Sequence, residues 1–195
     1  GFLGPRVYEA LYDVPFPAGV QTAENLFEHG LIDAVVDPEE LRDIAISALD
    51  VLCGFLPGGA QARGTLEALE AGRALDVVDA AHADRLGDVH AWESITRSRR
   101  ADRPGVRALL KVAASTVVPL NGTGQGETDP GLLLALARFG EAPCVLLGQD
   151  RRASARPLGP AGLREGRRGM RLAAELGLPL VSVIDTAGAA LSQEA

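Results

Sequence analysis

The sequence is poor in cysteine and has no long apolar run. Its 195 residues include only two cysteines, Cys53 and Cys144, too few for a disulfide framework. We interpret both as buried thiols in a reducing compartment. No apolar run approaches the roughly 18 residues that mark a membrane-spanning helix. The first residues also lack the charged and apolar regions of a signal peptide, so we expect a cytoplasmic protein without a membrane partner.

Basic residues are in short supply relative to acidic ones. Lys and Arg together number 19, against 26 Asp and Glu, which gives a formal net charge of −7. Because binding to nucleic acid phosphates needs a basic face, we exclude nucleic acid as the main partner. The hydrophobic content of 47% is enough for a packed core and argues against intrinsic disorder.

Methionine occurs once, at Met170, and the chain begins at Gly1. We therefore expect that the polypeptide was processed or is a piece of a longer protein. Its length suits one ordinary domain or pieces of two.

Hydrophobic periodicity predicts helices interleaved with strands, which is typical of an α/β fold. Helices are expected at 5–13, 21–29, 38–53, 89–100 and 160–177, and strands at 31–36, 116–120, 132–139, 144–149 and 179–185. Residues 140–143 would close a β-hairpin. The apolar stripe of the third helix would comprise Leu41, Ile44, Ala45, Ala48, Leu49 and Leu52. The region at 54–87 is interpreted as a connector, with possible short helices at 65–71 and 74–83.

Some motif candidates have simple structural explanations. Residues 121–126 resemble a nucleotide-binding loop, but an acidic, polar stretch and then a strand follow, so we interpret them as a flexible surface loop. His29, His82 and His90 do not stand at metal-ligand spacings, and we expect each on a helix surface or at a helix end. We predict neither a metal site nor a catalytic thiol.

Arginine is concentrated in one segment. Between residues 138 and 171 the chain has eight arginines and three acidic residues, so this segment carries +5 and the remainder −12. Arg164, Arg167, Arg168 and Arg171 share one face of the predicted helix. This face is either a solvated surface or a docking site for a small polyanion such as a phosphorylated cofactor.

The last candidate site follows the predicted strand at 179–185. Asp185 and a turn rich in Gly and Ala stand at the carboxyl end of a strand, where ligands gather in open α/β sheets. Backbone N–H groups of such a turn can stabilise a developing oxyanion. A plain strand-to-helix turn would have the same pattern, and spacing alone leaves both interpretations open.

Two stretches of the chain resemble one enzyme family. GFLGPRV at 1–7 and PAGVQTAENLFEHGLID at 17–33 are similar to the late segment of the β subunit of bacterial acetyl-CoA carboxylase carboxyltransferase. From about residue 91 the chain resembles the α subunit, through AWE at 91–93, DP at 129–130, LGQ at 147–149, PAGLR at 160–164 and IDTAGA at 184–189. Ala187 departs from the family's usual IDTPGA, and NGT at 121–123 stands in place of its usual GDR. The order implies a fused β–α polypeptide.

The resemblance implies a fold and a domain organisation. The fold would be crotonase-like (ClpP/crotonase), a superhelix of ββα-type units, with parts of two such domains in this chain. Residues 1–55 would be the C-terminal part of a β-type carboxyltransferase domain, 56–90 a connector, and 91–195 the N-terminal part of an α-type domain. The family's four-cysteine zinc ribbon would lie upstream, so zinc is not expected in this segment.

The resemblance also implies a reaction. The family moves a carboxyl group from carboxybiotin, held on its carrier protein, to acetyl-CoA, and gives malonyl-CoA in the first step of fatty-acid synthesis. The partners would be the biotin carboxyl carrier protein, biotin carboxylase and further copies of the full-length protein. Backbone N–H groups would stabilise the enolate and the biotin anion. The family's paired glycine turns would lie outside this chain, so its catalytic residues stay unknown, and we expect little or no activity from the isolated chain.

The resemblance and the charge pattern together give site candidates. Gly188 and Ala189 would line the substrate pocket. Candidates for binding the CoA phosphates are Arg151, Arg152, Arg164, Arg167, Arg168 and Arg171. Two alternatives stay open: the same chemistry on another acyl-CoA such as propionyl-CoA, or in a malonate decarboxylase, and a non-catalytic crotonase-like assembly module.

Overall fold

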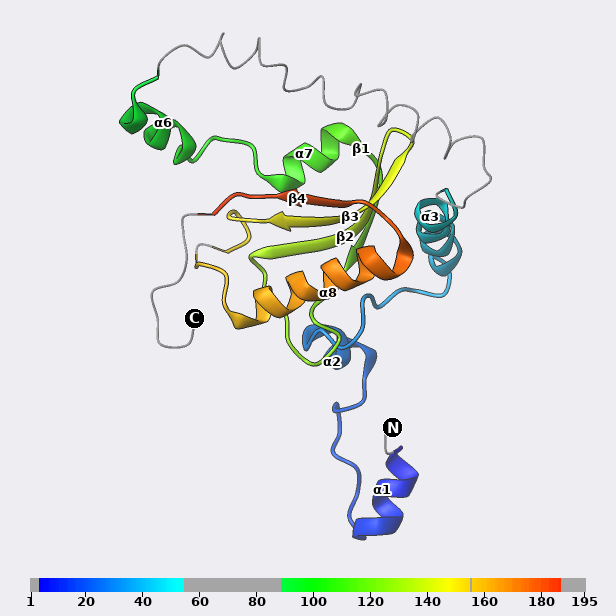
Figure 1. Cartoon of the computed structure of the whole chain (residues 1–195). Helices are drawn as coiled ribbons and strands as arrows, with labels where there is room; N and C mark the ends of the chain where they lie inside the picture. Colours follow the sequence, from blue (N-terminus) through cyan, green and yellow to red (C-terminus); the bar gives the residue numbers. More distant parts are fainter. Residues whose placement is uncertain (1–3, 55–88, 155, 187–195) are drawn as a thin grey trace.

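The computed structural model describes residues 4–54, 89–154 and 156–186 (Figure 1). Its helices are α1 (Pro5–Tyr12), α2 (Ala23–Glu28), α3 (Leu41–Cys53), α6 (Ala91–Ser98), α7 (Val106–Ala113) and α8 (Pro160–Leu176). Its strands are β1 (Ala114–Leu120), β2 (Leu132–Phe139), β3 (Ala142–Gln149) and β4 (Leu180–Val183). The predicted mixed α/β architecture is therefore confirmed. Within the described ranges, no helix is both long and apolar enough to cross a membrane.

The strands form one sheet in the order β1-β2-β3-β4. The first three strands pair antiparallel, whereas β3 and β4 pair parallel. The central strands β2 and β3 are almost entirely buried, as expected from their continuous apolar runs. The predicted β-hairpin is confirmed. Gly140, with a φ of 58°, lies in the tight turn between its strands, a conformation that glycine adopts easily.

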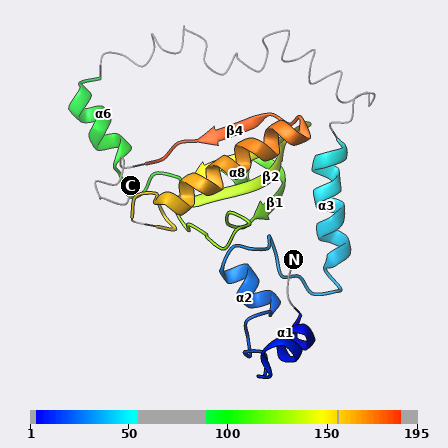
Figure 2. The ribbon, with the colours of Figure 1, turned by 60° about the horizontal axis from the view of Figure 1, so that its bottom comes forward.

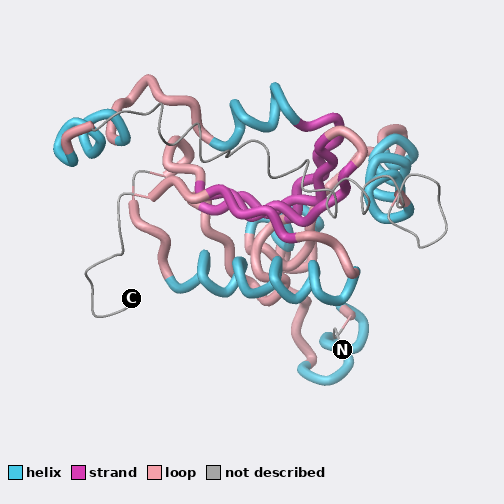
Figure 3. The backbone as a smooth tube through the Cα atoms, turned by 45° about the horizontal axis from the view of Figure 1, so that its top comes forward, coloured by secondary structure: helices cyan, strands magenta, loops and turns pink. Residues whose placement is uncertain are grey.

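Helices cover both faces of the sheet (Figure 3). Helix α8 lies on one face, where its Ala173 belongs to the same buried cluster as Leu134 and Leu147. Helix α7 lies on the other face, where its Val106 is clustered with Leu146. Alternate residues of the central strands therefore contribute to two cores, one on each side of the sheet.

Helix α3 joins the core on the face of the sheet that α8 covers. Figure 2 shows α3 beside the sheet, and Val51 of this helix is fully buried in the cluster that includes Ala173. The predicted apolar stripe was largely wrong: Leu41 and Leu49 are 60% and 54% exposed, because α3 meets the sheet near its C-terminal end. Cys53 is exposed, contrary to prediction, since it lies two residues from Val51 and so on the other side of the helix.

Two predicted elements differ from the structure. Residues 31–36 form no strand. The segment at 30–33 lies against the loop at 121–127 and forms no ladder with a described strand. Residues 106–113, for which we predicted no element, form α7. The short helices predicted at 65–71 and 74–83 lie outside the described residues, and the domain boundaries stay predictions.

Candidate functional site at the carboxyl ends of strands β3 and β4

The carboxyl ends of two parallel strands meet at one edge of the sheet. Gly148 of β3 stands opposite Val183 of β4, so the residues that follow leave the sheet side by side. The backbone N–H of Asp185 donates to Oε1 of Gln149 at 2.8 Å, which ties the two strand ends together. Ligands of open α/β sheets bind at such an edge.

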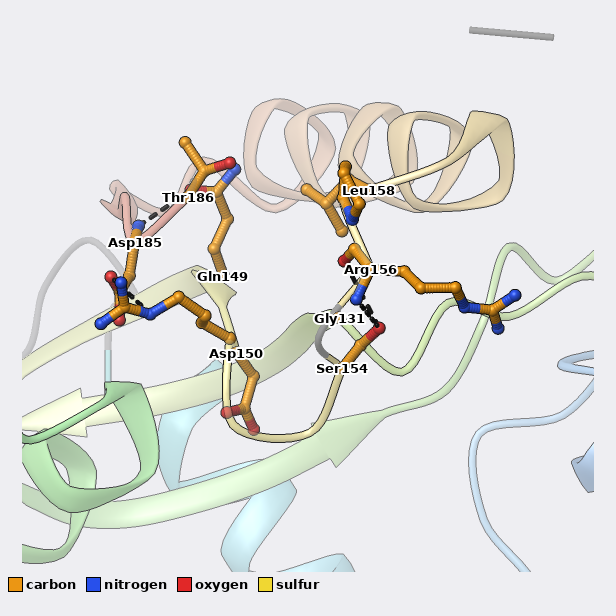
Figure 4. A pocket seen from close by; sticks show the side chains of 10 residues that line it. Gly131, Gln149, Asp150, Ser154, Arg156, Leu158, Asp185 and Thr186 are labelled. Atoms are coloured by element: carbon orange, nitrogen blue, oxygen red, sulfur yellow. Dashed lines mark hydrogen bonds and ion pairs between the residues drawn. The ribbon is translucent and has the colours of Figure 1, made fainter. Parts of the chain in front are cut away.

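A small cavity of about 30 Å³ opens at this edge (Figure 4). Its walls come from the start of β2, the ends of β3 and β4, and the loop before α8. The side chains include Gln149, Asp150, Ser154, Arg156, Asp185 and Thr186. Two separate parts of the chain, residues 149–156 and 185–186, therefore supply polar side chains to one small space.

Asp150 has a structural part in this wall. Its side chain is only 2% exposed, and its carboxylate accepts a hydrogen bond from Nε of Arg107 at 2.5 Å. Its backbone N–H donates to the carbonyl of Gly131 at 2.8 Å, which joins the end of β3 to the start of β2. With these partners the buried Asp150 holds the wall of the cavity in place. Its carboxylate already accepts a hydrogen bond from a protein donor.

Asp185 lies between two arginines. Its carboxylate accepts a hydrogen bond from Arg103, in the segment between α6 and α7, and lies 3.6 Å from Nε of Arg151. Its side chain is 10% exposed. These ion pairs fix the path of the chain as it leaves β4.

A second cavity, of about 310 Å³, opens beside Asp185 on the side of α6. Among the described residues, three arginines line it, Arg99, Arg103 and Arg151, whereas Asp185 is the single acidic residue in its wall. Positive charge therefore exceeds negative charge in this cavity, and arginine is well suited to bind phosphate. Sequence patterns did not identify Arg99 and Arg103 as candidates, because only the fold brings α6 and the segment after it close to the end of β4.

The structure places the six predicted arginines in different surroundings. Arg151 faces Asp185, and Arg152 donates to the carbonyl of Arg103 at 2.7 Å. On α8, Arg164 and Arg168 point to acidic partners, Glu127 and Asp33. Arg167 and Arg171 are exposed and form no ion pair with another described residue. Gly188 and Ala189 lie outside the described residues, so their role stays a proposal.

The loop at 121–126 is more buried than predicted. Gly122 and Thr123 are buried, because the loop folds over the segment at 30–33 and is not a free surface loop. Its amide groups bind protein atoms: the N–H of Thr123 donates to the carbonyl of Glu127 at 2.8 Å. In this arrangement the loop has a structural role, because it connects the segment at 30–33 to the rest of the fold.

The described cysteines and histidines form no reactive cluster. Burial raises the pKa of the Cys144 thiol to about 11, so this thiol stays protonated at neutral pH. His29 and His90 stand at helix ends, as predicted, whereas His82 lies outside the described residues. Among the residues that the structure describes, no group of His, Cys, Asp and Glu could hold a metal ion.

Glu165 is a buried carboxyl group that we did not predict. It occupies the buried stripe of α8 together with Gly162, Gly169 and Ala173. Burial, with a smaller contribution from the carboxylate of Asp129, raises its pKa to about 7, although the backbone N–H of Asp129 and the charge of Arg168 act in the opposite direction. The sequence contained the evidence for this burial, because Glu165 lies at helical spacing with the small residues Gly162, Gly169 and Ala173, which share its face of α8.

Glu165 should make the protein less stable as the pH rises from about 4.5 to about 7. The folded state holds the proton up to about pH 7, whereas the unfolded chain releases it near its ordinary pKa of 4.5. The free energy of unfolding should therefore fall between these two values. We expect Glu165→Gln to gain about 2 kcal/mol relative to the wild type between pH 5 and pH 8, as measured by urea unfolding. A difference between the two proteins that does not change with pH would contradict this.

The fold and this edge define an α/β protein with polar and cationic groups where two parallel strands end. Residues 68–195 match a family model described as acetyl co-enzyme A carboxylase carboxyltransferase-like. The chain belongs to this family, which confirms the resemblance found in the sequence.

Named relatives are similar along nearly the whole chain. A Mycobacterium tuberculosis protein named "probable biotin-dependent acyl-coenzyme A carboxylase beta3 subunit" is 52% identical over all of this chain, which covers 36% of that protein. A Parafrankia protein named "acetyl-coenzyme A carboxylase carboxyl transferase subunits beta/alpha" is 33% identical over 97% of the chain, which covers 34% of it. A Frankia alni protein of the same name is 33% identical over 97% of the chain. The chain spans about a third of the length of these relatives.

Proposed function

We propose that the protein containing this chain transfers a carboxyl group from carboxybiotin, held on its carrier protein, to acetyl-CoA, and gives malonyl-CoA. The observation that carries this proposal is the family match, together with relatives whose names join the β and α subunits of one carboxyltransferase. In the reaction, the N–C bond of carboxybiotin breaks and a C–C bond forms at the α-carbon of the thioester. That carbon gives up a proton, and biotin gains one.

The proposal includes partners and a fold. Carboxybiotin has to be supplied by a biotin carboxylase and a biotin carboxyl carrier protein, and we propose that the active protein is an oligomer. We also propose the crotonase-like superhelix as its fold, with which the small mixed sheet is compatible.

A second candidate is the same transfer to another acyl-CoA, such as propionyl-CoA. The relative with 52% identity supports it, because its name specifies only an acyl-coenzyme A carboxylase. The test combines the protein with biotin carboxylase, biotinylated carrier, ATP and bicarbonate, and compares initial rates for acetyl-CoA and propionyl-CoA. A faster rate with acetyl-CoA supports the first candidate and a faster rate with propionyl-CoA the second. No carboxylated product from either would contradict both and favour an assembly module.

The second cavity is our proposed binding site for the CoA phosphates. Its lining carries Arg151, one of the predicted candidates, with Arg99 and Arg103. Arg103 and Arg151 already share the carboxylate of Asp185, whereas Arg99 forms no ion pair with any described residue and can turn to a phosphate. Arg167 and Arg171 on α8 are the other exposed candidates.

Replacing Arg99 should weaken the binding of acyl-CoA. We expect Arg99→Ala to raise KM for acyl-CoA about tenfold with little change in kcat, since one charge-assisted contact contributes about 1.5–3 kcal/mol. The measurement is a steady-state titration of acyl-CoA, repeated with an acyl-pantetheine that has no nucleotide phosphates. The effect of the variant should vanish with this shorter substrate.

Two further variants make this test specific. Arg42→Ala removes an exposed arginine of α3 and serves as the control for a lost charge, with an unchanged KM expected. If Arg167→Ala raises KM and Arg99→Ala does not, the phosphates bind on α8 and the cavity beside Asp185 is not their site.

A further inference from the structure

The segment at 30–33 and the loop at 121–127 meet at very short range. The two segments cross at Gly30 and Gly122, and each of these glycines has a positive φ. A Cβ atom placed on Gly122 would lie 2.5 Å from the Cα atom of Gly30, so only glycine permits this approach. The N–H of Gly124 donates to the carbonyl of Gly30 at 2.8 Å, which adds a backbone hydrogen bond to the contact.

Arg168 of α8 binds both sides of this crossing. Its NH2 group donates to the two carboxylate oxygens of Asp33, at 2.9 and 2.8 Å. Its NH1 group donates to the carbonyls of Asn121 and Gly122, both at 2.9 Å. The N–H of Asn121 completes the network by donating to the carboxylate of Asp33 at 2.9 Å. One guanidinium therefore holds a carboxylate from near the N-terminus and two carbonyls of the loop.

This network is more than an exposed ion pair. The side chain of Arg168 is 21% exposed, and it satisfies two backbone carbonyls besides the carboxylate. A lysine has one ammonium group and cannot reproduce the planar fork of these four bonds. Because Asp33 and Arg168 are 135 residues apart in the sequence, the network joins two distant parts of the chain.

The clamped loop leads directly to the cavity at the carboxyl ends of the strands. At its far end, the carboxylate of Asp129 accepts hydrogen bonds from the N–H groups of Gly131 and Gly159, at 2.9 and 3.0 Å. Gly131 lines the cavity and accepts the backbone hydrogen bond of Asp150. A continuous stretch of ten or so residues therefore connects the Arg168 network to the cavity wall.

We propose that Arg168 and Asp33 act as a positioning pair, which holds the loop at 121–131 and so keeps the cavity wall in place for the transfer reaction. The functional part of this inference rests on the proposed function. It assigns Arg168 to a different task from the binding of CoA phosphates, because the hydrogen bonds of its guanidinium group are directed into the protein.

The experiment compares Arg168→Lys and Asp33→Asn with the wild-type protein. Hydrogen–deuterium exchange of peptides that cover residues 120–126 reports on the clamp without any substrate. Both variants should speed exchange there about tenfold or more, because the amides of Asn121 and Gly124 lose their protection. Glu175→Gln, an exposed change at the other end of α8, is the control and should leave this exchange unchanged.

The kinetic measurement separates positioning from phosphate binding. A misplaced cavity wall should lower kcat for carboxyl transfer about tenfold in both variants, with KM for acyl-CoA within about twofold of the wild type. Asp33→Glu, which keeps the charge, should recover part of kcat. A phosphate contact would instead give Arg168→Lys a nearly normal kcat with a raised KM, and would leave Asp33→Asn active.

The outcomes keep the two proposals distinguishable. Unchanged exchange in both variants would overturn the clamp, and faster exchange with unchanged kinetics would overturn its link to the reaction. A raised KM with normal kcat in Arg168→Lys would overturn the positioning role in favour of CoA binding. If the wild type transfers no carboxyl group while exchange is faster in both variants, the proposed function fails and the clamp stands.

Discussion

Gly122→Ala should destabilise the protein by about 3 kcal/mol or more. The φ of Gly122 is 59°, and an added Cβ would lie 2.5 Å from both the carbonyl oxygen of Glu127 and the Cα atom of Gly30. Both neighbours are backbone atoms, so no side-chain rotation can relieve the clash. The strain of a left-handed conformation adds about 1–2 kcal/mol. Urea unfolding followed by far-UV circular dichroism measures the loss.

Gly124→Ala is the matched control in the same loop. Gly124 also has a positive φ, 72°, but the nearest atom to an added Cβ would be Nε of Arg168 at 3.9 Å. This variant should therefore lose only the conformational part, about 1 kcal/mol. Equal losses in the two variants would mean that the close crossing with Gly30 contributes nothing to stability.

This crossing shows what the sequence alone cannot predict. The glycines at 122, 124 and 126 are visible in the sequence, and the strand pattern that follows them argued against a nucleotide-binding loop. The interpretation as a flexible surface loop missed the burial of Gly122 and Thr123, because their partner at Gly30 lies about 92 positions earlier in the sequence. Local patterns report on turns and periodicity, and they contain no information on which distant segment a loop will contact.

The same limit applies to the arginines of α8. Helical spacing predicted that Arg164 and Arg168 share a face, and the helix at Pro160–Leu176 confirms the element. Their partners, Glu127 and Asp33, come from a loop and from the segment after α2, so spacing on α8 could not identify them.

Strand predictions succeeded or failed according to their pairing. The hairpin of β2 and β3 was predictable, since two apolar runs are joined by a short connection and each is the other's partner. The segment at 31–36 has a similar apolar content, but it pairs with no strand in the part of the chain that the structure describes, so its residues form no ladder there. A strand is a property of a pair, whereas a helix such as α1 or α8 is largely determined by its own residues.

A second large effect is expected where α3 meets the sheet. Arg138 of β2 is 8% exposed, its NH2 group donates to the carbonyl of Asp50, and its Nε lies 3.1 Å from the carboxylate of Asp50. The Asp50 side chain, at 51% exposed, remains accessible to water. One partner is therefore a buried cation and the other a partly solvated anion. Removing each of them should have a different cost.

Asp50→Ala should cost more than Arg138→Met. The first change leaves a buried guanidinium whose nearest remaining carboxylate among the described residues is that of Glu141, 4.0 Å away, and we expect a loss of about 3 kcal/mol. The second change removes the buried charge and fills its space with an apolar chain, so the expected loss is about 1 kcal/mol. Both losses are free energies of unfolding, measured in urea at neutral pH.

The double variant Asp50→Ala/Arg138→Met decides between two origins of this stabilisation. If the loss in Asp50→Ala comes from an orphaned buried cation, removing that cation as well should restore most of the stability, so that the double variant is more stable than Asp50→Ala. If the attraction between the two charges were itself the main term, Arg138→Met would cost as much as Asp50→Ala, and the double variant would be no better than either. Asp43→Ala, which removes an exposed acid of α3, should change stability by no more than about 0.5 kcal/mol and controls for the lost negative charge.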